Sequence, residues 1–331
     1  LSIPLQYGGQ GLGLAHEVAF ASAAARAQAP DALGRIGRIL TAPTLIEHGT
    51  QEQKDKYLNP ILSGEHVWCQ GFSEPGSGSD LASLSTRATP DGDSWVINGQ
   101  KVFITNGHSA DLLLLACKTD PTQRGPGVSL LLVETDRPGF TRGRKLEKLG
   151  CKAQDTSELF FSDLRVPASN LLGEEGAGFK ILMTQLAQER LVQAIRAVSA
   201  SEAALEWTRS YVTDRKMFGQ TLADFQNTRF TLANLHAQVQ AQRVYVDRCI
   251  ELHLQQALDP VDAAACKLVT TDLQFSVMDQ CLQFFGGWGY MWEYPITRAF
   301  ADARMCRIGG GAAEVMKQII ANQILPTTRR A

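Results

Sequence analysis

The sequence predicts an α+β protein in which a helical region, a β-rich region and a second helical region follow one another along the chain. Ala-rich stretches run through roughly the first 65 residues, and apolar runs of strand length fill the segment from about 67 to 172. From about residue 178 onward, long segments with helical periodicity dominate. Because strands and helices do not alternate, a parallel sheet of the Rossmann type is not expected.

Each region has its own sequence signals, which predict domains at 1–66, 67–172 and 173–331. Glycines at positions 8, 9, 11 and 13 precede an Ala-rich helix in the first region. In the second, residues 95–97 (Trp-Val-Ile) and 101–104 (Lys-Val-Phe-Ile) flank Asn98-Gly99, a dipeptide that favours a hairpin turn. Further strands are expected at 112–117, 127–133 and 158–161. In the third, helices are expected to break at Gly219, at Pro260, at 286–295 and at 309–311.

The composition narrows the classes of partner. With 32 basic and 34 acidic residues the net charge is −2, which gives no reason to expect nucleic acid or an anionic membrane surface as a partner. The seven cysteines are dispersed and read as free thiols in a reducing compartment. The six histidines show no metal-binding spacing, so no metal is expected, and no apolar run is long enough to predict an integral membrane segment.

Two glycine-rich segments carry the residue types of a ligand site. In residues 72–80, Phe-Ser-Glu-Pro-Gly-Ser-Gly-Ser-Asp, backbone N–H groups and hydroxyls can converge on an anion or a polar ring edge. In residues 283–290, Gln-Phe-Phe-Gly-Gly-Trp-Gly-Tyr, glycines between aromatics favour close backbone approach to a flat ligand. By themselves these residues leave open a flexible turn and an aromatic helix connection packed on the core.

Together with residues 308–316, Ile-Gly-Gly-Gly-Ala-Ala-Glu-Val-Met, these segments resemble the signatures of the acyl-CoA dehydrogenases. Residues 287–295 are most similar to the long-chain branch, and the resemblance runs from about residue 3 to about 325. It implies an acyl-CoA dehydrogenase-type fold with a helical N-terminal part, an antiparallel β-domain and a C-terminal four-helix bundle. The opening helices of the family are then expected to be missing.

The resemblance implies FAD as the cofactor. Phe72, Ser73, Gly78 and Ser79 match residues that touch the flavin or its pyrophosphate, and Phe103 and Thr105 match residues that flank the isoalloxazine ring. Arg215 and Phe218 match residues that hold the pyrophosphate across a subunit interface, and Gln283, Gly286 and Gly287 match residues that reach a neighbouring subunit's FAD. The expected cofactor-binding set is completed by Gln226, Ala312 and Glu314.

The resemblance also implies the position of the catalytic base. Many members place a glutamate where this chain has Gly310, so the base is expected at Glu189, as in the long-chain and isovaleryl branches. Phe179, Leu182, Met183 and Leu186 form a stripe with helical spacing, and Glu189 is expected to continue this buried face. Burial raises the pKa of a carboxylate, which helps a base that removes a weakly acidic proton. A structural ion pair of Glu189 with Arg190 or Arg196 is the alternative.

Other positions bear on the substrate. The backbone N–H of Gly310 is expected to bind the thioester oxygen. Ser79, Gln154, Arg190 and Gly309 are expected to contact the acyl-CoA. The chain departs from long-chain members at Gly309, where they carry a tyrosine, at Ala312, which lacks a hydroxyl, and at Asn322, where many members have an arginine. The small residues at 309 and 310 predict a wide pocket for long or branched acyl groups.

The implied reaction is α,β-dehydrogenation of an acyl-CoA thioester to the trans-2-enoyl-CoA, as in fatty acid β-oxidation. In the family's mechanism Glu189 would remove the Cα proton while a hydride passes from Cβ to the flavin. The resemblance further implies electron-transfer flavoprotein as the acceptor, a homotetramer built as a dimer of dimers, and a bacterial cytoplasmic or mitochondrial matrix location. Two alternatives stay open, a flavin oxidase or monooxygenase on the same fold and a non-catalytic scaffold protein.

Overall fold

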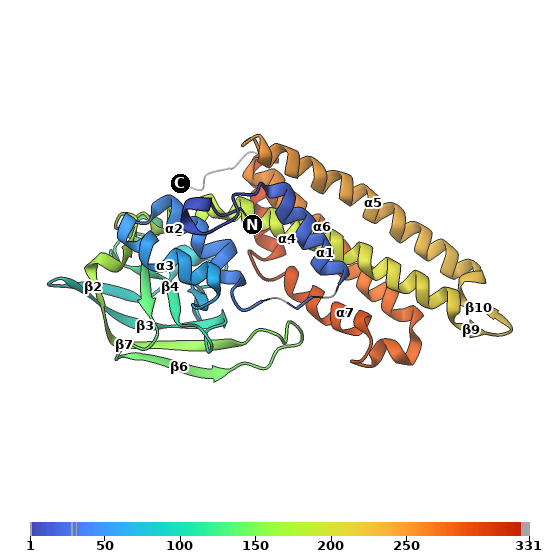
Figure 1. The fold of residues 1–331 in the computed structure, drawn as a ribbon, viewed down its shortest axis with the longest axis horizontal. Coiled ribbons are helices and arrows are strands. Elements are labelled where there is room, and N and C mark those ends of the chain that lie inside the picture. Colours follow the sequence, from blue (N-terminus) through green and yellow to red (C-terminus); the bar gives the residue numbers. More distant parts are fainter. Residues whose placement is uncertain (1, 28, 31, 326–331) are drawn as a thin grey trace. The chain divides into compact units, whose positions relative to one another are not determined.

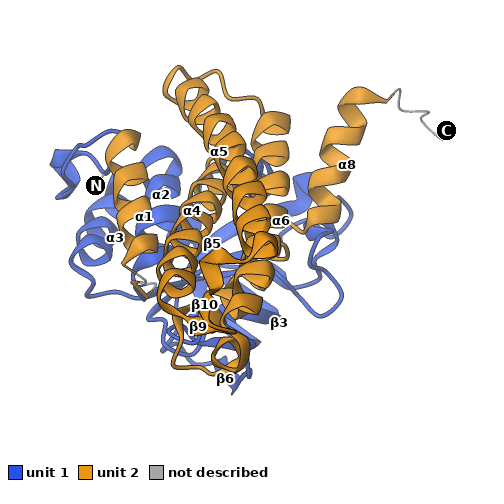
Figure 2. Cartoon of the chain, turned by 90° about the vertical axis from the view of Figure 1, so that its right-hand side faces the viewer, with its two compact units in different colours: residues 1–13, 31–185 blue, residues 14–30, 186–331 orange. Residues whose placement is uncertain are grey.

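The protein is represented by a computed structural model that describes residues 2–27, 29–30 and 32–325. The chain forms two compact units (Figure 2). The first comprises Leu1–Gly13 and Asp31–Gln185, and the second comprises Leu14–Pro30 and Leu186–Ala331. The boundary falls within the long helix α4 (Gly178–Asp214). The sequence predicts three domains, and that division stays a prediction, because the two compact units divide the chain differently.

An eight-stranded sheet forms the centre of the first unit (Figure 1), in the order β6-β7-β3-β2-β4-β5-β8, with β1 paired to β4. All pairings are antiparallel except β1 with β4 and a single parallel pair between β2 and β4. The antiparallel β-domain is therefore confirmed in its main pairings. The strands are β1 (Trp68–Gly71), β2 (Arg87–Asp91), β3 (Ser94–Thr105), β4 (Leu112–Lys118), β5 (Val128–Glu134), β6 (Phe140–Lys145), β7 (Thr156–Pro167) and β8 (Leu171–Leu172).

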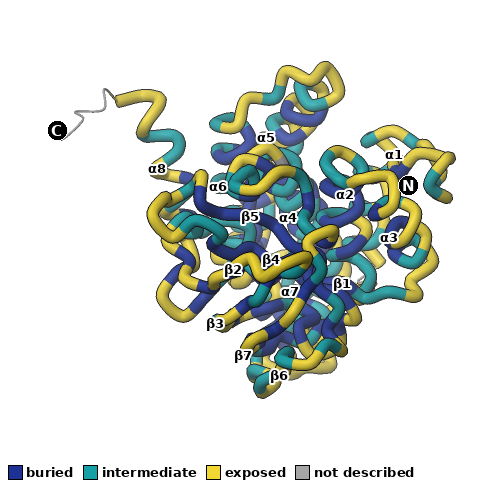
Figure 3. The backbone as a smooth tube through the Cα atoms, turned by 90° about the vertical axis from the view of Figure 1, so that its left-hand side faces the viewer, coloured by how far each residue is buried: buried dark blue, intermediate teal, exposed yellow. Residues whose placement is uncertain are grey.

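Strand β4 is buried along its whole length because a hydrophobic core lies on each face of it. Figure 3 colours the backbone by burial, with buried residues in dark blue. Alternate side chains of a strand point to opposite faces. Leu112 and Leu114 accordingly join a core with α2 (Ala42–His48) and α3 (Gln51–Ser63), whereas Leu113 and Leu115 join the core on the other face. The apolar run at 112–117 therefore reads as a central strand.

The hairpin expected at Asn98-Gly99 is wrong. Both residues lie inside the continuous strand β3, and the turn that precedes β3 is at Gly92, with φ +64°. The pairing of β3 with β7 is irregular at this point, and the Asn98 side chain exchanges hydrogen bonds of 3.0 and 2.9 Å with Asp163. Glycine is required at 99 because a Cβ would lie 2.5 Å from the Thr86 hydroxyl. A bulge, which also favours glycine, explains the dipeptide.

The second unit is helical (Figure 1), which confirms the helical C-terminal part. Its helices are α1 (Leu14–Arg26), most of α4, α5 (Gln226–Leu254), α6 (Pro260–Phe284), α7 (Pro295–Cys306) and α8 (Ala313–Ile324). The breaks expected at Gly219 and Pro260 are present: Gly219 lies in the turn between the short strands β9 (Lys216–Met217) and β10 (Gln220–Thr221). Pro260 begins α6, whose first turn is capped by Asp259.

Several sequence expectations concern the described part of the chain as a whole. All seven cysteines are free thiols. Over residues 2–27, 29–30 and 32–325, no helix is long and apolar enough to cross a membrane. The same residues contain no group of three or more His, Cys, Asp or Glu side chains that could hold a metal ion.

Candidate active site

A buried ion pair fixes the loop at residues 72–80 in the first unit. Backbone hydrogen bonds between Glu74 and Ser77, at 2.8 and 3.1 Å, close a tight turn. The Glu74 carboxylate accepts from Lys101 Nζ at 2.8 Å and from the backbone N–H groups of residues 85 and 86. Lys101 Nζ also donates to the carbonyl of Phe72 at 3.0 Å. The loop is thus tied to β3, the strand that carries Phe103 and Thr105.

The electrostatics of this pair favour the charged carboxylate. Burial alone would raise the pKa of Glu74, but the charge and hydrogen bond of Lys101, with those of Ser85 and Thr86, outweigh it and lower the pKa to about 2. Burial lowers the pKa of Lys101, and Glu74 opposes that shift. The side chains are 3% and 0% exposed, so the pair is a deeply buried element of the loop.

Phe103 has the conformation expected of a residue that faces a ligand. Its φ is +60° and its ring is 70% exposed, at a point where the pairing of β3 with β7 shifts register. A positive φ is costly for a large residue, and such strain is concentrated at functional sites. Across the loop, Ser79 is exposed and a Cβ built on Gly78 meets no atom within 4 Å. Phe72, Ser73 and Thr105 are half-buried.

Beside Phe103 lies a cavity of about 390 Å³. Its lining is rich in cations, which suit an anionic ligand such as a phosphate; the other lining residues are Arg144, Lys145, Leu146, Glu147, Lys148 and Thr156. Gln154 is buried nearby in the chain, with its Nε2 lacking a hydrogen-bond partner among the described residues. An unpaired buried donor is a candidate for binding a ligand or a water.

In the second unit, the β9–β10 hairpin presents a second exposed aromatic side chain. Phe218 and Gly219 form its turn with φ values of +51° and +79°, the pattern of a type I′ turn. Phe218 is 89% exposed, although glycine or asparagine would fit this backbone better. Arg215 precedes the hairpin and Gln226 begins α5, and both are exposed.

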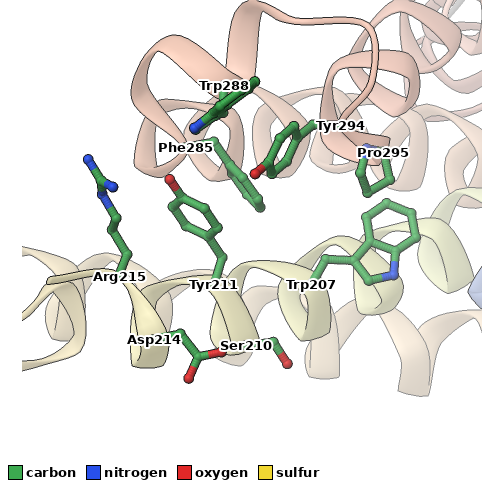
Figure 4. A pocket seen from close by; sticks show the side chains of 9 residues that line it. All are labelled: Trp207, Ser210, Tyr211, Asp214, Arg215, Phe285, Trp288, Tyr294 and Pro295. Atoms are coloured by element: carbon green, nitrogen blue, oxygen red, sulfur yellow. The ribbon is translucent and has the colours of Figure 1, made fainter.

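Arg215 also lines an aromatic cavity of about 480 Å³ (Figure 4). Tyr211 on α4 stacks on Phe285 with ring centroids 4.3 Å apart, and Trp288 stacks on Tyr294 at 5.2 Å. The remaining lining residues are Trp207, Ser210, Asp214 and Pro295. Gln283, Gly286 and Gly287 are exposed, and a Cβ on either glycine would meet open space, which leaves room for close approach to their backbone.

Helix α4 carries Glu189 and Arg190. Glu189 is half-buried, while Arg190 is 6% exposed and its Nε has no hydrogen-bond partner among the described residues. Burial lowers the pKa of Arg190, and the negative charge of Glu189 opposes that shift. The expected apolar stripe is wrong at Met183, which is 40% exposed, whereas Leu182 is buried. The helix turns these neighbours to different environments, since they are only one residue apart.

The glycine loop between α7 and α8 meets α4 at Gln193. Gly310 has φ +63°, and a Cβ built on it would lie 2.0 Å from Gln193 Nε2. Gln193 follows Glu189 by four residues, so the two side chains lie on one face of α4, a single turn apart. The Oε1 of Gln193 is buried and has no hydrogen-bond partner among the described residues. Ala312 is the N-cap of α8, and Glu314 is exposed in its first turn.

These contacts bear on the wide pocket expected from the small residues at 309 and 310. The space that opens at Gly310 is taken by the amide of Gln193. At Gly309 a Cβ would meet the Sδ atom of Met305 at 2.7 Å. Larger neighbouring side chains therefore lie directly beside both glycines, and the wide pocket expected there stays a prediction.

Lys267 binds the same glycine loop, and it was not identified from the sequence. It is 1% exposed, and its Nζ donates to the carbonyls of Gly309, at 2.7 Å, and of Gly311. Burial lowers its pKa to about 8. A signal was available, because Lys267 is a lone charge in the small and apolar stretch 263–269. Gln193 gave a weaker signal, as a polar residue between apolar neighbours.

Comparisons with known proteins agree with the architecture. The family descriptions of the N-terminal, middle and C-terminal domains of acyl-CoA dehydrogenase match residues 1–65, 69–164 and 176–325. The mitochondrial long-chain specific acyl-CoA dehydrogenase of Mus musculus is 46% identical over 288 residues, which cover 86% of this chain and 67% of the relative. An acyl-CoA dehydrogenase structure from Geobacillus kaustophilus is 44% identical with a TM-score of 0.94, covering 97% of this chain and 85% of that one.

A further solved structure carries the reduced cofactor. It is a glutaryl-CoA dehydrogenase from Mycobacterium smegmatis in complex with FADH2, 28% identical with a TM-score of 0.82, covering 88% of this chain and 74% of that one. One conclusion follows from three findings. All three domain descriptions match, the sheet is flanked by helices, and the named relatives are acyl-CoA dehydrogenases. This chain belongs to the acyl-CoA dehydrogenases, a family of flavoprotein oxidoreductases.

Proposed function

We propose that this protein catalyses the FAD-dependent α,β-dehydrogenation of a long- or branched-chain acyl-CoA to the trans-2-enoyl-CoA, with Glu189 as the base. The observation that carries the proposal is the contact between Gln193 and Gly310. It supports a site in which Glu189, one helical turn before Gln193, lies close to the glycine loop. Four residues of α-helix rise only about 6 Å.

Glu189 is the residue of this chain best suited to take the Cα proton. Position 310 offers no carboxylate, and its left-handed backbone and the Gln193 amide disfavour any side chain there. A glutamate held half-buried on a long helix is pre-positioned, because the helix fixes its backbone. Removal of the proton leaves an electron pair at Cα that delocalises onto the thioester oxygen.

Gly310 is the proposed donor to that oxygen. Its N–H makes no hydrogen bond to any described residue, so it is available to a ligand. A backbone N–H suits this role because it needs no reorganisation as negative charge develops. Arg190, buried with a free Nε, and Gln154, buried with a free Nε2, are the proposed contacts to other parts of the acyl-CoA, together with Ser79 and Gly309.

The residues present fit FAD. Two exposed aromatic rings with positive φ, Phe103 and Phe218, and open space over Gly78, Gly286 and Gly287 suit a flat ligand approached closely by backbone. When bound, FAD supplies the acceptor for the hydride from Cβ. We assign the cofactor to the residues of the two glycine-rich segments, β3 and the β9–β10 hairpin; the others are Phe72, Ser73, Ser79, Thr105, Arg215, Gln226, Gln283, Ala312 and Glu314. The relative solved with FADH2 supports this assignment.

The remaining parts of the proposal concern substrate length and partners. The 46% identity to a long-chain specific enzyme supports a long acyl chain. We propose electron-transfer flavoprotein as the acceptor, a homotetramer in which Arg215 and residues 283–287 complete a neighbour's FAD site, and a bacterial cytoplasm or mitochondrial matrix as the compartment. The relatives named include mitochondrial and bacterial proteins.

A panel of acyl-CoA thioesters tests the proposal. The purified protein should be yellow, release FAD on denaturation, and reduce an artificial electron acceptor with straight or branched long-chain acyl-CoAs more efficiently than with butyryl-CoA. A colourless protein that FAD cannot reconstitute would exclude the enzyme and favour a scaffold role. Turnover supported by oxygen alone, with hydrogen peroxide as the product, would identify an oxidase instead.

A further inference from the structure

Lys267 is a buried cation whose hydrogen-bond partners are backbone carbonyls. Its Nζ lies 2.7 Å from the carbonyl oxygen of Gly309 and also donates to that of Gly311. Within the part of the chain that the structure describes, no carboxylate pairs with this ammonium group. A buried charge without a counter-ion is costly, so its presence beside the glycine loop calls for a role beyond packing.

The geometry of the peptide group supplies that role. The carbonyl of Gly309 and the N–H of Gly310 belong to one planar peptide unit, and the chain has no cis peptide bond among its described residues. In a trans peptide the two groups point in opposite directions. The hydrogen bond from Lys267 therefore fixes the direction of the Gly310 N–H. It also polarises the peptide, which strengthens that N–H as a donor.

We infer that Lys267 is a positioning residue for the dehydrogenation, which orients and polarises the 309–310 peptide so that the Gly310 N–H binds the developing negative charge on the thioester oxygen. The inference rests on the proposed function, because it requires an acyl-CoA thioester as substrate. In this step the Cα–H bond breaks, the proton passes to the Glu189 carboxylate, and the electron pair delocalises onto the thioester oxygen. Lys267 acts through the peptide and touches no reacting atom.

A purely structural clamp is the competing explanation. Such a clamp would need hydrogen bonds to the loop, but not a positive charge. The two roles predict different C=O stretching frequencies for a bound thioester, because this frequency falls as hydrogen-bond donors polarise the carbonyl. This frequency reports donor strength directly and does not depend on turnover.

The experiment uses flavin-loaded protein with Glu189→Gln, so that the bound thioester persists, and palmitoyl-CoA labelled with ¹³C at the carbonyl. Isotope-edited infrared spectra are compared for this protein and for the same protein with Lys267→Met or Lys267→Gln. We expect a clear lowering of the stretch in the parent and loss of most of that lowering with Met. Glutamine can keep a hydrogen bond but not the charge, so the Lys267→Gln protein should also lower the C=O stretch much less than the parent does.

Lys118 provides a matched control. It is a buried lysine of the first unit whose Nζ likewise donates to two backbone carbonyls, those of Gln123 and Arg124. Lys118→Met should leave the thioester stretch unchanged. In protein that retains Glu189, Lys267→Met should lower kcat about 10-fold or more, with little change in KM. This loss should be smaller than the ~10²–10³-fold loss in kcat that follows removal of a direct hydrogen-bond donor. FAD content and thermal unfolding check that each variant is folded.

The outcomes are distinguishable. An equal lowering of the stretch in the parent and in the Lys267→Met protein would overturn the inference while leaving the proposed function standing. Full recovery with Lys267→Gln would identify the clamp and also overturn it. If the parent bound the thioester without any lowering, the oxyanion role of Gly310 would fail, and the inference with it.

Discussion

The amide of Gln193 occupies the space into which a side chain on residue 310 would project, with its Nε2 2.0 Å from the ideal Cβ position of Gly310. Gly310 also has φ +63°, a conformation that side chains rarely adopt. Two independent constraints therefore keep residue 310 a glycine in this chain. Both disfavour a base at this position and support one on α4.

Gly310→Ala should destabilise the protein for both reasons. The left-handed backbone alone costs about 1–2 kcal/mol, and the collision with Gln193 adds to it. A second substitution, Gln193→Ala, should remove the steric contribution to this destabilisation and leave the backbone contribution. Urea unfolding of the two single variants and the double variant measures the coupling free energy.

Gly309→Ala is the matched control for this cycle. Gly309 lacks a positive φ, and the close contact of a Cβ there would be with the Sδ of Met305 at 2.7 Å, the far end of a flexible side chain, while the Met305 carbonyl oxygen lies at 3.7 Å. Its cost should be smaller than that of Gly310→Ala, and Gln193→Ala should not change it. Equal costs at 309 and 310, with no coupling to Gln193, would contradict the packing described here.

Arg215→Ala should weaken both FAD retention and subunit assembly. Arg215 is exposed beside the aromatic cavity and the strained Phe218 turn, as expected of a residue that completes a neighbour's site. Sedimentation velocity and the flavin-to-protein ratio measure the two effects. Arg209→Ala, which changes an exposed arginine of α4 paired with Glu206, serves as the control and should change neither. A flavin-loaded monomer in the wild type would exclude the shared site.

Lys101→Met should be strongly destabilising because it leaves Glu74 buried without its counter-ion. Loss of one partner of a buried pair costs about 3–5 kcal/mol. FAD binding should weaken too, since the pair ties the 72–80 loop to β3. Arg165→Met breaks the exposed pair with Asp91 and should cost only about 0–1 kcal/mol. Similar losses in the two variants would contradict the burial of the first pair.

The same pair predicts an acid-sensitive loss of stability. The pKa of Glu74 is lowered from 4.5 to about 2 on folding, so its ionised form stabilises the folded state at neutral pH. That contribution is lost as the pH falls from about 4.5 through about 2, because the unfolded chain binds the proton first. The free energy of unfolding should therefore depend less on pH over this window in Glu74→Gln. Parallel pH curves for the two proteins would refute the assignment.

Sequence patterns predicted the fold because its elements are locally encoded. The helical breaks at Gly219 and Pro260 and the buried strand at 112–117 follow from residue types alone. Asn98-Gly99 misled because the same dipeptide suits a hairpin turn and a bulge, and the choice depends on the distant residues Thr86 and Asp163. The partners of Lys267 could not be predicted either, since they lie more than 40 residues away in the chain.

The assignment of Glu189 came from a motif resemblance, and the structure adds the contact of Gln193 with Gly310 one turn later on α4. The half-burial of Glu189 could not be read from the stripe that was expected to carry it, because Met183 in that stripe is exposed. Helical periodicity gives the face of a helix, but which neighbours cover that face is set by tertiary packing. The role of Glu189 therefore needs a direct measurement.

Anaerobic flavin reduction tests the role of Glu189 most directly. Wild-type protein and Glu189→Gln are loaded with FAD and mixed with palmitoyl-CoA, and the bleaching of the flavin absorption is followed by stopped flow. The carboxamide keeps the shape of the side chain but cannot accept the Cα proton, so bleaching should slow by at least about 10²–10⁴-fold while the variant still binds the thioester. Bleaching of Glu189→Gln at a rate near that of the wild type would contradict the assignment of the base.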